Sequence, residues 1–228
     1  MTFSLVARCP DSGMFGTVVT SSSICVASRC SFVRPAVGAA QSQNITDPEL
    51  GPRLLDLCEQ GLSAQEAMAQ VVKETEKVQW RQLGVVDKNG GTACFSGSET
   101  LGIHAMAEGK DCVAMGNMLA NTEIPAAMVA AFEQAVGTLA ERLLMGIEAG
   151  LAAGGEAGPI HSAGLLVATA DMSWPVVNLR VDWEDEPDYA IAKLRSVWSN
   201  YLPQMQAYIV RSVTPENSDP YGVPGDPA

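Results

Sequence analysis

Positive charge is scarce in this sequence. Its 228 residues include 14 lysines and arginines against 26 aspartates and glutamates, which gives a formal net charge of −12 and an isoelectric point near 4.5. Sequence-independent binding to nucleic acid depends on lysine and arginine side chains that contact phosphates. Attraction to anionic lipid headgroups needs the same residues. We therefore expect neither a nucleic-acid partner nor a membrane partner.

The common motifs of metal and cofactor sites are also missing. The two histidines, His104 and His161, lie far apart and outside any HxxxH or HxxE pattern, so a zinc site is not indicated. There is no P-loop and no GxGxxG motif after an apolar strand. The six cysteines form no CxxC pair, and we interpret them as small buried hydrophobic side chains. We expect no metal and no cofactor.

Long apolar runs are missing as well. The sequence has no basic segment followed by an apolar one, as a secretory signal would have, and no apolar run long enough to span a bilayer. We therefore expect a cytoplasmic protein. With 47% hydrophobic and 18% charged residues, the composition is that of a globular chain with a sizeable core. We expect a single domain over residues 1–213 and a tail rich in proline and glycine over residues 214–228.

The order of predicted elements is strands, two helices, strands, two helices, strands and a last helix. Alternating and apolar runs predict strands, and helices are indicated by apolar stripes and capping residues, such as Ser63 with Glu66. Pro48 suits the first position of the first helix. The predicted strands cover residues 3–7, 16–20, 36–43, 82–87, 92–96, 111–115, 162–168 and 177–183. The predicted helices begin near residues 46, 63, 125 and 138, and the last covers residues 187–201.

Runs of strands that alternate with pairs of helices favour an α+β fold over a doubly wound parallel sheet. Two sheets packed face to face, with a helix pair outside each, satisfy this order of elements. We therefore predict a four-layer αββα sandwich.

The first strand carries the main candidate for chemistry, Thr2. If Met1 is removed, Thr2 has both a hydroxyl group and a free α-amine, whose usual pKa of about 7.7–8.0 suits it to act as a base for that hydroxyl. This is the N-terminal-nucleophile variant of the serine-triad logic. Many chains begin with methionine, threonine and an apolar residue for no catalytic reason, and Met1 stands in this sequence.

Two further features have a catalytic and an ordinary interpretation. Gly116 and Asn117 end a predicted strand, where a backbone N–H and a side-chain amide suit an oxyanion, but both residues are also common in turns. Arg34 near a threonine nucleophile would lower the pKa of its amine and attract an anionic substrate group, whereas an isolated arginine is more often a surface charge.

Several stretches together resemble a bacterial family known as domain of unknown function 1028. Their order and spacing make the resemblance specific, and it extends to about Trp198. The stretches are residues 2–8, 34–44, 50–56, 82–87, 116–119 and 140–144.

That family is similar to the Ntn hydrolases, αββα sandwiches like the proteasome subunits. The resemblance implies that Thr2 occupies the nucleophile position at the start of the first strand. It also implies that the stretches around Ser22, Arg34 and Gly116-Asn117 approach that position.

Two functions follow from these expectations. The first is an N-terminal-nucleophile amidohydrolase that acts on a small amide or related C–N bond, with Thr2, Gly116 and Asn117 catalytic and with Ser22 and Arg34 binding the substrate. The alternative is a non-catalytic protein on the same scaffold that binds a small molecule or serves in an assembly. In either case we expect a homo-oligomer, because the helices are apolar and weakly charged and the tail suits a neighbouring subunit.

Overall fold

The computed structural model describes residues 1–226 and contains two antiparallel β-sheets. The larger sheet has six strands in the order β10-β9-β2-β1-β8-β7. The first strand, β1, therefore lies in the middle of this sheet, between β2 and β8. The strands are β1 (Thr2–Arg8), β2 (Phe15–Ser21), β7 (Ala105–Gly109), β8 (Cys112–Asn117), β9 (Ser162–Ala168) and β10 (Val177–Val181).

The smaller sheet has four strands in the order β3-β4-β5-β6. It consists of β3 (Ser31–Arg34), β4 (Gly38–Asn44), β5 (Arg81–Asp87) and β6 (Thr92–Ser96). Strands β4 and β5 lie in its centre, and β4 packs against β1 and β2 of the larger sheet. The two sheets are therefore stacked face to face.

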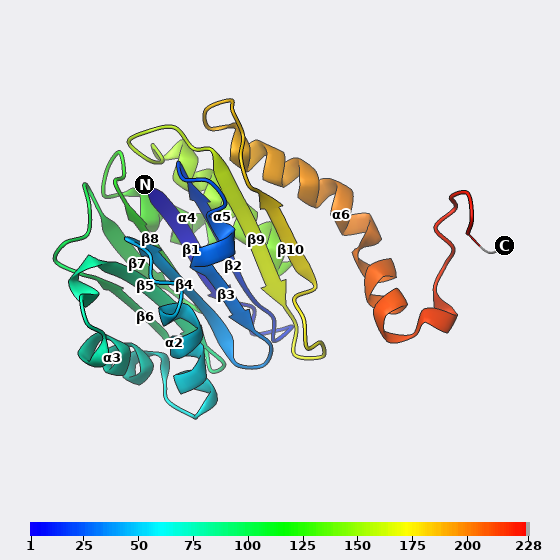
Figure 1. The fold of residues 1–228 in the computed structure, drawn as a ribbon, viewed down its shortest axis with the longest axis horizontal. Helices are drawn as coiled ribbons and strands as arrows, with labels where there is room; N and C mark the ends of the chain where they lie inside the picture. The colour runs from blue at the N-terminus through cyan, green and yellow to red at the C-terminus, as the bar shows by residue number, and fades with distance from the viewer. Residues whose placement is uncertain (227–228) are drawn as a thin grey trace.

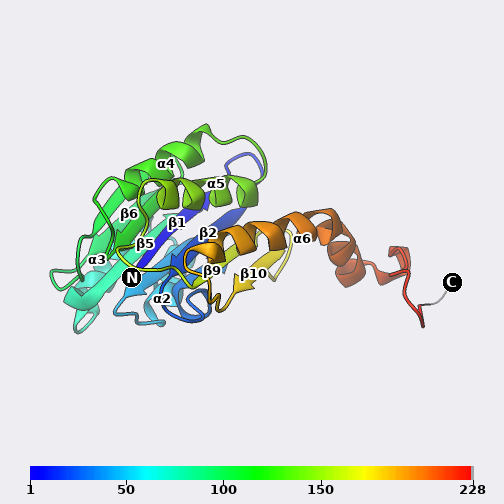
Figure 2. The same cartoon turned by 90° about the horizontal axis from the view of Figure 1, so that it is seen from above.

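Helices cover the outer face of each sheet, so the molecule has four layers (Figures 1 and 2). On the smaller sheet lie α2 (Leu50–Glu59) and α3 (Ala64–Glu74), and on the larger sheet lie α4 (Ile124–Gln134), α5 (Leu139–Ala152) and α6 (Tyr189–Val213). The predicted αββα sandwich is confirmed, with α6 as a third helix on the larger sheet.

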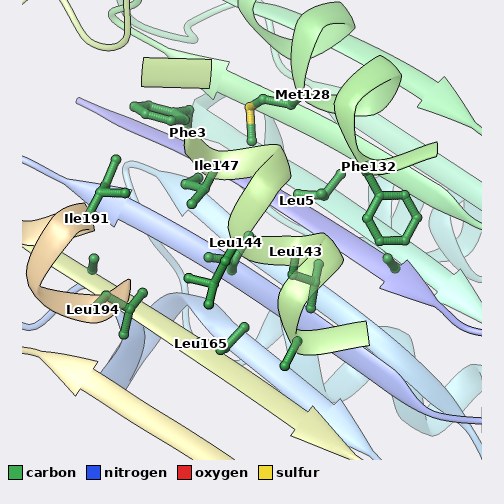
Figure 3. Packing of buried hydrophobic residues seen from close by; sticks show 14 of the residues in the cluster. Phe3, Leu5, Met128, Phe132, Leu143, Leu144, Ile147, Leu165, Ile191 and Leu194 are labelled. Carbon is green, nitrogen blue, oxygen red and sulfur yellow. The ribbon is translucent and has the colours of Figure 1, made fainter. Parts of the chain in front are cut away.

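The largest apolar core lies between the six-stranded sheet and its helices (Figure 3). Alternation along β1 points Phe3 and Leu5 to this side, where they meet Met128, Phe132 and Ile147 of α4 and α5. A second core lies between the four-stranded sheet and α2 and α3.

Between the two sheets the apolar cluster is small, and much of the remaining space is polar. The cluster consists of Val6, Phe15, Ala39, Val86 and Val113. Toward the start of β1, buried serine, threonine and glutamine side chains take its place. The outer cores therefore supply most of the apolar burial, and the layer between the sheets is partly a buried polar network.

Local sequence signals place most elements correctly. The hairpin at the N-terminus and the hairpin around residues 88–91 both form. Ser63 and Glu66 form the predicted capping box at the start of α3. Thr138 caps α5 by accepting a hydrogen bond from the Glu141 N–H.

Five local predictions were wrong or incomplete. Strands β3 and β7 were not predicted, and neither was the single helical turn α1 (Ala27–Cys30). Helix α2 begins at Leu50, because Pro48 lies in a turn closed by the Asp47 carbonyl and the Leu50 N–H. Helix α6 continues past Tyr201 and through Pro203 to Val213.

The C-terminal part of α6 runs past the edge of the larger sheet (Figures 1 and 2). Beyond it lie a short 3-10 turn, η2 (Pro215–Asn217), and a segment without regular structure that the model describes to residue 226. The last two residues of the predicted tail, 227–228, lie outside the described part. No helix within residues 1–226 is long and apolar enough to cross a membrane.

Candidate functional site

Strand β1 directs the Thr2 side chain into the space between the sheets. Phe3 and Leu5 face the helices, so Thr2, Ser4 and Val6 face the smaller sheet. The Ser4 hydroxyl donates to Gln43 Oε1 of β4 at 2.7 Å, which confirms this orientation. Thr2 lies at the end of the strand and is 6% exposed. It is therefore held rigidly, with its side chain close to the rim of the sandwich.

The Thr2 hydroxyl lies beside the hydroxyl of its cross-strand partner, Ser21. The two oxygens are 3.1 Å apart, and both hydroxyls also donate to the Met1 carbonyl oxygen, each at 2.5 Å. The Ser23 N–H donates to Ser21 Oγ at 3.1 Å and fixes that side chain. Two hydroxyl groups thus converge on one carbonyl oxygen.

Asn117 flanks Thr2 on the other side. It is the cross-strand partner of Thr2 on β8 and is fully buried. Its side-chain Nδ2 donates to Gln82 Oε1 at 3.0 Å, whereas its Oδ1 has no hydrogen-bond partner within the described chain. The predicted neighbourhood of Thr2 and Asn117 therefore forms, through the register of the sheet.

Gly116 lies beside this cluster as part of the backbone ladder. It is paired with Phe3 of β1 and with Ala105 of β7, and its carbonyl oxygen accepts a hydrogen bond from Gln82 Nε2 at 3.0 Å. A side chain at this position would collide with Leu119 and Phe3. The space available explains the glycine.

Gln82 is the centre of the buried polar network under the site. Its Oε1 accepts from Gln43 Nε2 at 2.8 Å and from Asn117, and its Nε2 donates to Ser96 Oγ at 2.8 Å and to the Gly116 carbonyl. Buried amide groups usually have hydrogen-bond partners, and both the oxygen and the nitrogen of the Gln82 side chain have them. The network links β1, β4, β5 and β8 and holds Asn117 in place.

A buried carboxyl group completes the site. Glu156 lies in the loop after α5, is 7% exposed, and accepts a hydrogen bond from the Ser22 N–H at 3.1 Å. Burial raises the pKa of Glu156 to about 8, against the opposing effects of the Met1 ammonium and of Ser22. Its other oxygen, Oε1, has no hydrogen-bond partner in the described chain.

The Met1 α-amine is the counterpart of this carboxyl group. Burial lowers the pKa of the amine, while the charge of Glu156 acts to raise it. Cys30 lies close enough to add a smaller effect of the same sign, and burial raises the pKa of its own thiol. Cys30 is therefore a buried thiol and not an activated thiolate.

The sequence-predicted residues fall into two groups. Thr2, Gly116, Asn117 and Ser22 come together around the start of β1. Arg34 does not join them: it pairs with Gly38 at the opposite end of β4 from Gln43, and its guanidinium forms ion pairs with Asp56 and Glu59 of α2. In this position it serves as a link between β3 and α2.

Sequence reasoning missed Ser21, Gln82 and Glu156. Ser21 becomes visible only through the β1–β2 register. Gln82 could have been found from the sequence, because it is a polar residue at a position of the apolar strand β5 whose side chain faces the space between the sheets. Glu156 follows two glycines in a segment without periodicity, and nothing local distinguishes it.

The histidines have structural roles. His161 Nδ1 lies 2.6 Å from the Glu184 carbonyl oxygen, and its ring stacks on Trp183 at 4.4 Å. His104 is exposed. Within residues 1–226 there is no group of three or more histidine, cysteine, aspartate or glutamate side chains that could hold a metal ion.

The arrangement of the layers defines the fold class of the protein. Two antiparallel sheets between layers of helices, with the first strand at the centre, form an Ntn-hydrolase-like sandwich. The model of a family of unknown function, DUF1028, matches residues 2–191. The chain belongs to this family.

Solved structures place the chain next to another member. The crystal structure of protein SPO2555 from Silicibacter pomeroyi, of the same family, is similar with a TM-score of 0.81 and 29% identity, over 88% of this chain and 85% of that chain. Among curated proteins no sequence match is found.

More distant similarities lead to Anbu, the ancestral β-subunit. Anbu from Yersinia bercovieri matches with a TM-score of 0.35 and 10% identity, over 90% of this chain and 96% of that chain. A Gly-1 mutant of Anbu from Hyphomicrobium sp. strain MC1 matches with a TM-score of 0.39 and 11% identity, over 91% and 97%.

Proposed function

We propose that the chain is an amidohydrolase whose nucleophile is the Thr2 hydroxyl, exposed together with the Thr2 α-amine once Met1 has been removed. The observation that carries the proposal is the convergence of the Thr2 and Ser21 hydroxyls on a carbonyl oxygen, at 2.5 Å each. A substrate carbonyl whose oxygen lies near these hydroxyls would have the Thr2 nucleophile and the Ser21 donor beside it.

The reaction follows from these groups. Thr2 Oγ attacks the amide carbon and passes its proton to the Thr2 α-amine. The C–N bond breaks, the leaving nitrogen takes that proton, and the acyl group remains as an ester on Thr2. Water then adds to the ester, the carboxylic acid leaves, and the hydroxyl of Thr2 is restored.

The neighbouring residues have supporting roles in this proposal. The Ser21 hydroxyl donates to the developing oxyanion, with the Asn117 amide as a second polar group across β1. Gly116 maintains the close packing of β8 on β1, and Ser22 orients Glu156. Arg34 has no part in the chemistry.

The test compares two forms of the chain, one beginning at Thr2 and one at Met1. Each is released from an N-terminal fusion by a specific protease and verified by intact mass. An alkyl β-lactone, a strained ester that acylates nucleophilic hydroxyls, is expected to add one acyl group to Thr2 of the first form and none to the second.

The Thr2→Ser variant is the conservative control and should still be acylated, whereas Thr2→Ala should not. Absence of an adduct on Thr2 in the form that begins at Thr2 would overturn the proposal. Equal labelling of both forms would also overturn it, because it would show that the free amine is not needed.

The second candidate function is a non-catalytic protein that keeps Met1. Two observations support it. The hydroxyls of Thr2 and Ser21 both donate to the Met1 carbonyl oxygen, and the Met1 amine is largely buried. Intact mass of the protein isolated without a fusion separates the two, since retention of Met1 leaves Thr2 without a free amine.

A further inference from the structure

Met1 is held in the site as a bound aminoacyl group would be. Its carbonyl oxygen accepts from Thr2 and Ser21. Its side chain lies on Gly158, where an added Cβ would come 2.5 Å from Met1 Cε and 2.9 Å from its sulfur. Its α-amine lies within the electrostatic influence of Glu156. The chain thus contacts Met1 at its carbonyl and its side chain, and the charge of Glu156 acts on its amine.

One carboxyl oxygen of Glu156 can accept a hydrogen bond for which the described residues supply no donor. One carboxyl oxygen accepts from the Ser22 N–H, while Oε1 is buried without a hydrogen bond in the described chain. Among the described residues no ion pair joins Glu156 to the Met1 amine, whose charge acts on it from a greater distance. Leaving a buried carboxyl oxygen unpaired is costly, so the site favours a donor that approaches more closely.

We propose that the space filled by Met1 is a subsite for an α-amino acyl group, whose ammonium binds Glu156, whose carbonyl meets Thr2 and Ser21, and whose apolar side chain lies on Gly158. The substrates are then small amides of apolar amino acids with a free α-amine. That these amides are cleaved rests on the proposed function. Their binding does not, because binding requires no turnover.

The contacts also explain why each part of the ligand is needed. The two hydroxyls bind any carbonyl and give no preference among acyl groups. Glu156 discriminates against an acylated amine, because an acylated nitrogen carries no positive charge to stabilise the carboxylate form of Glu156, which then keeps its proton. Gly158 leaves the room for a side chain, so a larger residue there would exclude methionine but not glycine.

The experiment measures binding of L-methioninamide by calorimetry to the forms that begin at Thr2 and at Met1. The first form should bind it and the second should not, because Met1 fills the subsite. N-Acetyl-L-methioninamide, which lacks the ammonium, should bind the first form about tenfold or more weakly. Equal affinity for the two ligands, or binding to the form that keeps Met1, would overturn the proposal.

Two variants of the form that begins at Thr2 test the assigned contacts. Glu156→Gln, nearly equal in shape, should lose about tenfold in affinity for L-methioninamide and leave that for the acetylated ligand unchanged. Gly158→Val should abolish binding of L-methioninamide while glycinamide still binds, which also shows that the variant is folded. Unchanged affinity for L-methioninamide in both variants would refute the assignment.

The outcomes separate this inference from the proposed function. Binding of L-methioninamide without acylation of Thr2 by the β-lactone refutes the hydrolase and leaves the subsite standing. Acylation of Thr2 together with equal binding of L-methioninamide and its acetylated form refutes the subsite and leaves the hydrolase standing.

Discussion

At the scale of single residues, the burial of Glu156 gives stability a distinctive dependence on pH. Its pKa is raised by burial to about 8 in the folded chain, from about 4.5 when exposed. The folded state therefore holds a proton that the unfolded state releases, and the free energy of unfolding falls as the pH rises from about 4.5 to about 8. The full effect is on the order of 5 kcal/mol, since one pKa unit is about 1.4 kcal/mol.

The Glu156→Gln variant should lack this fall. We expect its free energy of unfolding, relative to the unmodified chain, to increase steadily between pH 5 and pH 8. Urea unfolding of both proteins at several pH values measures the difference directly. Parallel pH profiles for the two proteins would contradict the expectation.

Gln82 is the residue on which the polar network under the site depends. The Gln82→Leu variant preserves approximate size but leaves donors of Gln43 and Asn117 buried without their acceptor. Each such loss costs about 1–3 kcal/mol, so for the two together we expect destabilisation of about 2–6 kcal/mol. Denaturant unfolding provides the measurement.

Gln79→Leu is the matched control for that variant. Gln79 is an exposed glutamine in the short 3-10 turn (Val78–Trp80) that precedes the same strand, and its substitution should change stability by less than about 0.5 kcal/mol. Similar effects of the two substitutions would mean that the network does not stabilise the fold.

At the scale of elements, α2 packs so closely on β3 that a glycine is required. A Cβ built on Gly51 would lie 2.0 Å from Cδ2 of Phe32. Replacing glycine with alanine inside a helix normally stabilises it by up to about 1 kcal/mol, but here overpacking should reverse the sign and cost about 1–3 kcal/mol.

The prediction for Gly51→Ala is tested best in a double-mutant cycle with Phe32→Ala. Without the ring, the added methyl group has room, and Gly51→Ala should become neutral or stabilising. Thermal or denaturant unfolding of the four proteins yields the coupling. An additive result would show that the close approach has no energetic consequence.

The elements themselves could largely be read from the sequence, and the failures have local causes. Alternation in β1 and the capping box of α3 are signals within a few residues. Strand β7 was missed because its Ala-Met-Ala-Glu-Gly sequence has few residues that favour strands, and its pairing with β8 decides its structure. The last helix was predicted to end at Tyr201, but α6 continues through Pro203 to Val213.

The site was harder to predict than the fold, because it depends on register. Thr2 could be singled out by its position in the sequence, and Asn117 by the resemblance to a family. Ser21 enters the site as the cross-strand partner of Thr2, 19 residues away in the sequence. Glu156 enters it from a loop that folds back onto Ser22, 134 residues away. No pattern along the chain reports such contacts.

At the scale of the whole molecule, the C-terminal part of α6 carries exposed apolar side chains that nothing in the described part of the single chain covers. It extends past the edge of the larger sheet (Figure 1). Its sequence carries an apolar stripe at intervals of three and four residues. The stripe consists of Leu202, Met205, Ile209 and Val213. Met205 and Ile209 are partly buried against the core of the chain, whereas Leu202 is 43% exposed and Val213 is 55% exposed. These two exposed apolar side chains are the ones that a second copy could cover.

We therefore expect the chain to form a homo-oligomer through this part of α6. Light scattering should give a mass of at least twice the 24.0 kDa of one chain. The double variant Leu202→Ser with Val213→Ser should shift the mass to that of a monomer, because the apolar area that drives association is lost. Val136→Ser, at an 89% exposed valine between α4 and α5, should leave the mass unchanged. A monomer mass for the unmodified chain at working concentration would refute self-association, and an unchanged oligomer in the double variant would assign the interface to another surface.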